Sequence, residues 1–90
     1  MFVAIACDLG SDDRRRELYS MLRQYGFEAV LEDVYESVSI HPGSLSRLKR
    51  DIDRHTDSYD TVRLYQYPSE DTLVISSLSG KRWRKTVLRP

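Results

Sequence analysis

The chain has 90 residues, of which 40% are apolar and 31% charged, and this composition predicts one small globular domain rather than two domains or a disordered chain. The longest apolar run, residues 2–7, is too short to cross a bilayer and lacks the basic flank of a signal peptide, so we expect a cytoplasmic protein with no membrane partner. Cys7 is the only cysteine, which excludes an internal disulfide and a cysteine-based zinc site.

The formal net charge is zero, but the two halves of the chain differ in sign. Residues 1–45 contain 4 basic and 8 acidic side chains, whereas residues 46–90 contain 10 basic and 6 acidic ones. The last ten residues contain five bases and no acid. The overall charge therefore does not predict a nucleic-acid-binding protein, although local basic patches are compatible with one.

The chain opens with a pattern for a strand followed by a helix. Residues 2–7 form a continuous apolar run, which is typical of a central strand covered on both faces. Residues 12–25 then carry apolar side chains at helical spacing. Ser11 suits the N-cap of this helix and Gly26 suits its C-cap, so we expect the helix between them.

A long strand pattern follows the first helix. Residues 27–38 are strand-like over about twelve positions, whereas strands usually have five or six. The consecutive acids Glu32 and Asp33 are candidates for a bend or bulge in this stretch. We therefore expect either one bent strand or two strands here.

The second half of the chain predicts a helix and two further strands. Residues 45–55 have apolar side chains at helical spacing and a crowded charged outer face. Residues 60–67 alternate apolar and polar side chains, as a strand with one polar face does. Residues 72–78 are β-branched and apolar, and the tight turn at residues 68–71 makes them the returning strand.

Two helices on one face of an antiparallel sheet form a ferredoxin-like α/β sandwich of the α+β class, which we expect over residues 1–78. The other face of the sheet carries polar and aromatic side chains such as Tyr65 and Tyr67, which suit a second subunit better than solvent. Residues 79–90 form a basic C-terminal tail. Because this tail contains Trp83 and other apolar side chains, we expect a short strand that pairs with an open sheet edge, with the partner subunit as one candidate.

Three stretches of the chain carry a resemblance to a known family. Residues 2–8 look like its first strand, which ends in an aspartate, and residues 12–18 look like the arginine-rich helix start that follows. Residues 25–27 and 34–36 look like its Tyr-Gly turn and its Val-Phe-Glu strand end. The chain thus resembles, over about its first 78 residues, the small universal CRISPR-associated protein that is the partner of the CRISPR integrase.

The resemblance implies a ferredoxin-like homodimer in which Asp8 of each subunit faces its counterpart near the two-fold axis. Family members are described as magnesium-dependent endonucleases for RNA or double-stranded DNA. It therefore implies that Asp8 is a catalytic residue and a Mg²⁺ ligand shared across the dimer. The same proteins bridge two integrase dimers and hold new spacer DNA on a basic surface, so the implied partners are the CRISPR integrase and duplex DNA or RNA.

The position of Asp8 is compatible with this chemistry. It ends a buried strand, where the strand fixes the position of a side chain that can reach a ligand. One carboxylate is a poor Mg²⁺ site, but two carboxylates joined by a dimer axis can bind the ion together with waters and phosphate oxygens. The alternative is an aspartate that only caps or turns the chain.

Basic side chains in three segments are candidates for nucleic-acid contacts, because a guanidinium matches phosphate geometry. They are Arg14, Arg15, Arg16, Arg47, Arg50, Lys81, Arg82 and Arg84. The three consecutive arginines spread over about 200° of a helix, so they cannot all serve one groove. The alternatives are ion pairs with neighbouring acids in the first segment, a solvated mixed face in the second, and docking on a partner protein in the third.

The expected function is that of a CRISPR spacer-acquisition adaptor. Sequence-independent contacts to backbone phosphates suit this task, because a new spacer can have any sequence. Hydrolysis by a pair of Asp8 residues is a second hypothesis. A toxin-like ribonuclease or a non-enzymatic regulatory domain of the same fold is the alternative, because fold does not fix function.

Overall fold

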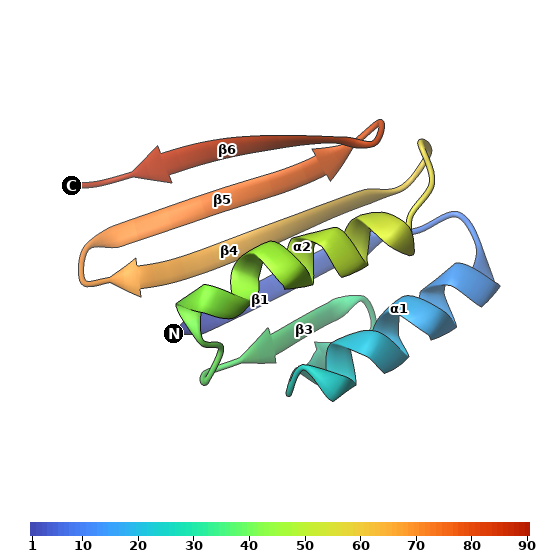
Figure 1. Ribbon diagram of the computed structural model, residues 1–90, viewed down its shortest axis with the longest axis horizontal. Coiled ribbons are helices and arrows are strands. Elements are labelled where there is room, and N and C mark those ends of the chain that lie inside the picture. Colours follow the sequence, from blue (N-terminus) through green and yellow to red (C-terminus); the bar gives the residue numbers. More distant parts are fainter.

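The computed structural model describes residues 1–90 and contains one antiparallel sheet of six strands with two α-helices (Figure 1). In chain order the elements are β1 (Phe2–Asp8), α1 (Asp12–Gln24), β2 (Glu28–Leu31), β3 (Val34–Ser37), the 3-10 helix η1 (Pro42–Ser44), α2 (Leu45–Arg54), β4 (Thr61–Ser69), β5 (Thr72–Ser79) and β6 (Arg82–Leu88). The strands lie in the order β2-β3-β1-β4-β5-β6. The first four of these have the ferredoxin-like arrangement, so the predicted α+β sandwich is confirmed.

Helix α1 begins and ends as the sequence predicts. The Ser11 hydroxyl accepts a hydrogen bond from the backbone N–H of Arg14 at 3.3 Å, which caps the N-terminus. Gly26 has a φ of 95° after the helix, a left-handed conformation that glycine adopts without strain. Leu18 and Leu22 lie on one side of α1 and are fully buried against the sheet.

The long strand-like stretch at residues 27–38 is a hairpin. It contains β2 and β3, and the acidic residues Glu32 and Asp33 form the turn between them. The two strands pair antiparallel, with a register shift between Ala29 and Leu31. The two-strand alternative is therefore confirmed, and each strand has an ordinary length.

Helix α2 covers the sheet beside α1. Its apolar residues Leu48 and Ile52 are fully buried in the common core. Neither helix of the protein is long and apolar enough to span a membrane.

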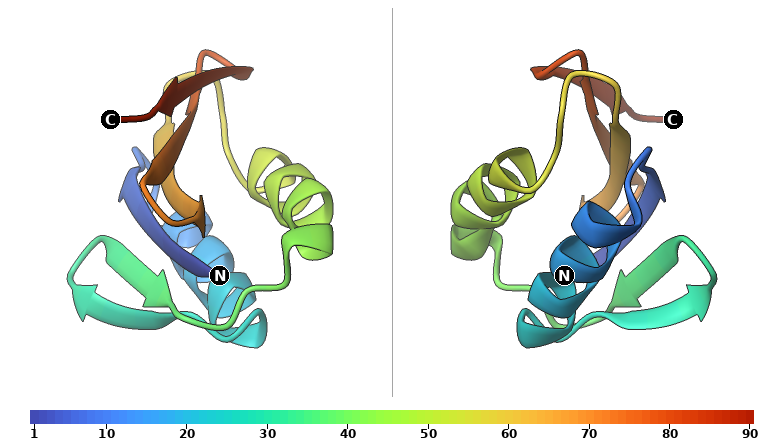
Figure 2. Two further views of the ribbon diagram at one scale, coloured as in Figure 1. Left: turned by 90° about the vertical axis from the view of Figure 1, so that its left-hand side faces the viewer. Right: turned by 90° about the vertical axis from the view of Figure 1, so that its right-hand side faces the viewer.

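The alternating pattern of β1 separates the two faces of the sheet. Val3, Ile5 and Cys7 point toward the helices and belong to the core, whereas the residues between them point the other way. Figure 2 shows that both helices lie on the same side of the sheet. We call the side without helices the open face.

The C-terminal residues form the sixth strand and extend the sheet beyond residue 78. Strand β6 pairs with β5 of the same chain from Ser79 opposite Arg82 to Leu73 opposite Leu88. Trp83 points to the helix side and packs against the core. The sheet therefore ends in a basic edge strand at β6.

Candidate nucleic-acid interface

Asp8 is the last residue of β1, and its side chain is exposed on the open face. It lies directly opposite Thr61, the first residue of β4. No hydrogen bond or ion pair of the structure engages its carboxylate. The strand thus fixes the position of the backbone while both carboxylate oxygens stay accessible to a ligand.

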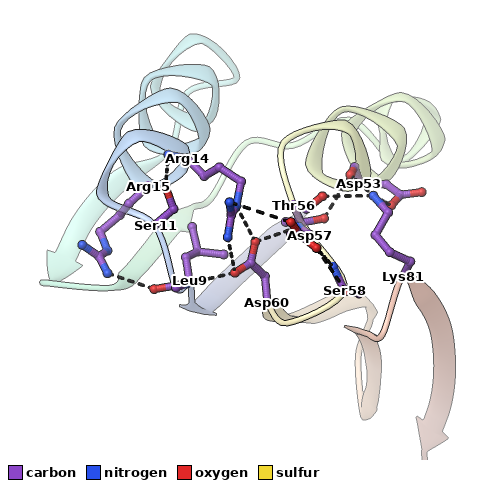
Figure 3. Close-up of polar contacts among 11 residues, drawn as sticks. Leu9, Ser11, Arg14, Arg15, Asp53, Thr56, Asp57, Ser58, Asp60 and Lys81 are labelled. Carbon is purple, nitrogen blue, oxygen red and sulfur yellow. Dashed lines mark hydrogen bonds and ion pairs between the residues drawn. The ribbon is translucent and has the colours of Figure 1, made fainter.

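The backbone that follows Asp8 is held in place by Asp60, whose side chain is completely buried. Asp60 Oδ1 accepts a hydrogen bond from Gly10 N at 2.9 Å, and Oδ2 accepts one from Asp57 N at 2.7 Å. Arg14 donates to the same carboxylate, as Figure 3 shows. This Asp60 cluster (Asp60, Arg14 and the amides of Gly10 and Asp57) joins the loop after β1 to the turn before β4.

The Asp60 carboxylate is ionised at neutral pH. Its burial alone would raise its pKa, but the hydrogen bonds from Arg14 and from the two backbone amides lower the pKa to about 2. The hydrogen bond to Asp60 in turn raises the pKa of Arg14. The structure therefore places Arg14, one of the predicted nucleic-acid contacts, in a structural ion pair.

The two neighbouring arginines of α1 also have local acidic partners. Arg15 forms an ion pair with Asp12 and donates from Nη2 to the carbonyl oxygen of Leu9 at 2.9 Å. Arg16 forms an ion pair with Asp13 on the exposed side of the helix. These i, i+3 pairs correspond to the alternative interpretation of the first basic segment.

The remaining predicted contacts differ in how firmly they are engaged. Arg47 donates from Nε to the Tyr25 hydroxyl at 3.2 Å, and its guanidinium lies over the Tyr25 ring. Lys81 lies 2.5 Å from Asp53 Oδ1, so it connects the turn before β6 to the end of α2. Arg50 is exposed on α2 and has no ion-pair partner.

Three exposed arginines, Arg63, Arg82 and Arg84, lie on the open face toward the end of the sheet where Asp8 lies, and they form no ion pairs. The pairing register shows their arrangement in two neighbouring rows across the sheet: Asp8, Thr61, Ser79 and Arg82 in one row, and Ala6, Arg63, Ser77 and Arg84 in the next. Rows of one face are about 7 Å apart along a strand. Because β4, β5 and β6 contain no acidic residue, this arginine face (Arg63, Arg82 and Arg84) is uniformly basic.

Arg63 is the member of the arginine face that was not among the predicted contacts. Its guanidinium lies 5.3 Å from the centre of the Tyr65 ring, a cation–π contact on the open face. The alternation of residues 60–67 does place both side chains on the polar side of the strand. The sequence alone does not give the pairing register, which puts Arg63 in the same row as Arg84 and one row away from Asp8.

The other half of the open face is apolar. It consists of Phe2, Tyr65, Tyr67, Leu73, Ile75 and Leu88, which we call the apolar half. The rings of Phe2 and Tyr67 lie 5.6 Å apart. Tyr67 and Leu88 remain 48% and 49% exposed, so this contiguous apolar surface is not covered within the chain.

One chain supplies only part of a Mg²⁺ site. No group of three or more histidine, cysteine, aspartate or glutamate side chains gathers anywhere in the structure. Mg²⁺ typically binds one or two carboxylates and completes its octahedron with waters and substrate phosphates. The Asp8 carboxylate fits such a site only as a single ligand, and the other ligands would come from outside this chain, from water, substrate or a second copy.

The fold and this surface define a small ferredoxin-like domain with a free acidic strand end next to a basic sheet face. The family model described as CRISPR associated protein Cas2 matches residues 1–75. The match covers most of the chain, and the protein therefore belongs to this family, as the resemblance implied. Searches among curated proteins and among solved structures found no match. Membership in the family supports a role in CRISPR adaptation.

Proposed function

We propose that the protein is a structural adaptor of CRISPR adaptation that binds duplex DNA and bridges integrase dimers. The observation that carries the proposal is the arginine face: Arg63, Arg82 and Arg84 are exposed, unpaired and free of acidic neighbours on their strands. Arginines on a flat sheet can contact successive phosphates without reading bases, so binding would be independent of sequence. That property suits DNA of arbitrary sequence.

The working unit in this proposal is a homodimer formed through the apolar half of the open face. The apolar half is an exposed surface of aromatic and aliphatic side chains, including Tyr67 and Leu88. A two-fold symmetric contact would bury it in both copies at once, since the same patch serves both partners. The dimer would present two arginine faces to one duplex. It would also carry two Asp8 carboxylates, one from each copy.

Binding of a 30-base-pair duplex over a range of salt concentrations tests this proposal. Each lost phosphate contact makes the slope of log K against log salt shallower by about 0.9. We expect Arg63→Ala and Arg84→Ala each to flatten the slope and weaken binding. The matched control is Arg16→Ala, because that guanidinium is paired with Asp13 on the helix layer. An unchanged slope in both test variants, or a larger effect from the control, would contradict the proposal.

A second candidate function is Mg²⁺-dependent phosphodiester hydrolysis, favoured by the accessible and unpaired carboxylate of Asp8. When bound there, Mg²⁺ would stabilise charge on the phosphoryl oxygens and lower the pKa of an attacking water. Asp8 itself would hold the ion at the strand end, and the Asp60 cluster would keep the adjoining loop fixed. No observation favours a toxin-like ribonuclease or a regulatory domain.

The Asp8→Ala variant separates the two functions. RNA and double-stranded DNA cleavage and spacer integration are followed in parallel with the same preparation. Loss of cleavage with intact integration would make hydrolysis incidental to the adaptor role. Cleavage that survives the substitution would remove Asp8 from the hydrolytic mechanism.

A further inference from the structure

The side chain of Lys49 lies between helix α2 and strand β6 and has no acidic partner. Its Nζ lies 5.8 Å from the centre of the Trp83 ring, and the residue is partly buried. No side-chain hydrogen bond or ion pair of the structure involves it. Because lysine ammonium groups are seldom withdrawn from water without a partner, this side chain is a candidate for a role of its own.

The acidic residues of α2 are engaged elsewhere. Asp53, one helical turn after Lys49, pairs with Lys81 at 2.5 Å, as Figure 3 shows. Asp51 accepts a hydrogen bond from the Tyr25 hydroxyl at 2.6 Å. Strands β4, β5 and β6 contain no acidic residue. Lys49 therefore lacks a carboxylate that would hold its proton.

A second lysine lies on the same side of β6. Lys85 follows Trp83 by two residues, so both side chains point to the helix side, about 7 Å apart along the strand. Ser76, which lies opposite Lys85, is buried on that side. Burial and the nearby charge of Lys85 lower the pKa of Lys49. The lower pKa increases the share of uncharged amine, which is the nucleophilic form.

We propose that Lys49 is an acylation site for small acyl phosphates and that the Lys85 ammonium holds the phosphate group of the reagent. An acyl phosphate combines an electrophilic carbonyl carbon with a doubly charged phosphate. This chemistry fits an amine beside a second lysine that forms no ion pair, with the Trp83 ring next to the amine. The site lies on the helix side of the sheet, so the inference goes beyond the proposed function and does not depend on it.

The proposed step needs no further reagent. The uncharged Lys49 nitrogen attacks the carbonyl carbon of the acyl phosphate, and a C–N bond forms. The bond between that carbon and the phosphate oxygen breaks, and its electron pair leaves with the phosphate, which also takes up the proton that the nitrogen releases. No atom is oxidised or reduced. The product is an uncharged amide, which removes the repulsion between Lys49 and Lys85.

The chain has three lysines, Lys49, Lys81 and Lys85, so their reactivities can be compared within one protein. The full chain is incubated with acetyl phosphate at pH 8 and cleaved after glutamate, which places Lys49 in residues 37–70 and the other two in residues 71–90. Mass spectrometry then follows acetylation at each lysine. We expect Lys49 to react at least about 5-fold faster than the other two in the folded protein, and the three rates to agree within about 2-fold in denaturing urea.

Lys85→Gln tests the role of the second ammonium. The matched control is Arg89→Gln, which removes one exposed charge from the same end of the chain. We expect Lys85→Gln to slow the acetylation of Lys49 by acetyl phosphate by at least about 5-fold, the effect of one ion pair close to water. Its effect on the reaction with an uncharged acetyl ester should be smaller, since the ester has no phosphate to hold. Arg89→Gln should leave both rates unchanged.

Two results would overturn the inference. Equal rates at the three lysines of the folded protein, or a slower rate at Lys49, would remove the acylation site. An equal effect of Lys85→Gln on the two reagents would remove the phosphate-holding role of Lys85. Because Lys85 and Arg89 are exposed, both variants should unfold at the wild-type temperature. Either result would leave the adaptor proposal standing, because the arginine face lies on the other side of the sheet.

Discussion

Arg14 binds both carboxylate oxygens of Asp60, 46 residues further along the chain, through Nε to Oδ2 at 2.8 Å and Nη2 to Oδ1 at 3.2 Å. Together with a longer ion pair from Arg14 Nη1 to Asp57 Oδ2 at 3.9 Å, this two-point pair links α1 to the turn before β4. It explains why an arginine at the start of α1 is engaged in the fold and not free for phosphate. It also fixes the loop that follows Asp8.

Removing the Asp60 charge should destabilise the protein. In Asp60→Asn, the amide keeps the volume of the side chain but turns a donor group toward Arg14 or toward a backbone N–H. We expect the free energy of unfolding at pH 7 to fall by about 1–3 kcal/mol, the cost of leaving buried partners unsatisfied. Urea denaturation measures it. Asp13→Asn is the control, since its exposed pair with Arg16 should contribute less than about 1 kcal/mol.

The contribution of Asp60 should depend on pH in a defined direction. Its folded-state pKa of about 2 lies below the unfolded-state value of about 3.9, so the carboxylate stabilises the fold at higher pH. That stabilisation is lost as the pH falls from about 4 toward 2. Urea midpoints of wild type and Asp60→Asn should therefore converge below pH 4. A gap between them that stays constant from pH 6 to pH 2 would contradict the assignment.

Cys7 should be unreactive in the folded protein. The pKa of the Cys7 thiol is raised to about 12, mainly by burial and in smaller part by the charge of Asp33. The thiol is also only 9% exposed, on the helix side of β1. A thiol-specific chromogenic reagent at pH 8 should label the protein at least about 100-fold faster in denaturing urea than in buffer. Comparable rates in the two conditions would show that the strand is not packed as described.

Much of the fold could be predicted because its local signals are strong. Ser11 and Gly26 delimit α1, and the alternation of residues 60–67 identifies β4 and its polar side. For residues 27–38 the sequence is compatible with both a bent strand and a hairpin, because an acidic pair such as Glu32 and Asp33 fits a bend as well as a turn. The antiparallel pairing of β2 with β3 in the folded chain decides between them.

The candidate site was harder to predict, because it depends on long-range register and on which charges find partners. The position of Asp8 at the end of β1 could be predicted, because the apolar run before it identifies the strand. Arg14 and Lys81 look like free cations in the sequence, but their acidic partners, Asp60 and Asp53, are brought to them only by folding. The opposite holds for Arg63, which becomes part of a basic surface only when β5 and β6 align beside β4.

If two copies join through the apolar half of the open face, the mass of the protein in solution shows it most directly. Sedimentation equilibrium at micromolar concentration should give twice the chain mass of 10.5 kDa for wild type and for Ser46→Glu, an exposed control on α2. Ile75→Glu, in the apolar half, should give a folded single chain of 10.5 kDa. A wild-type protein that sediments as a single chain across this concentration range would contradict the account.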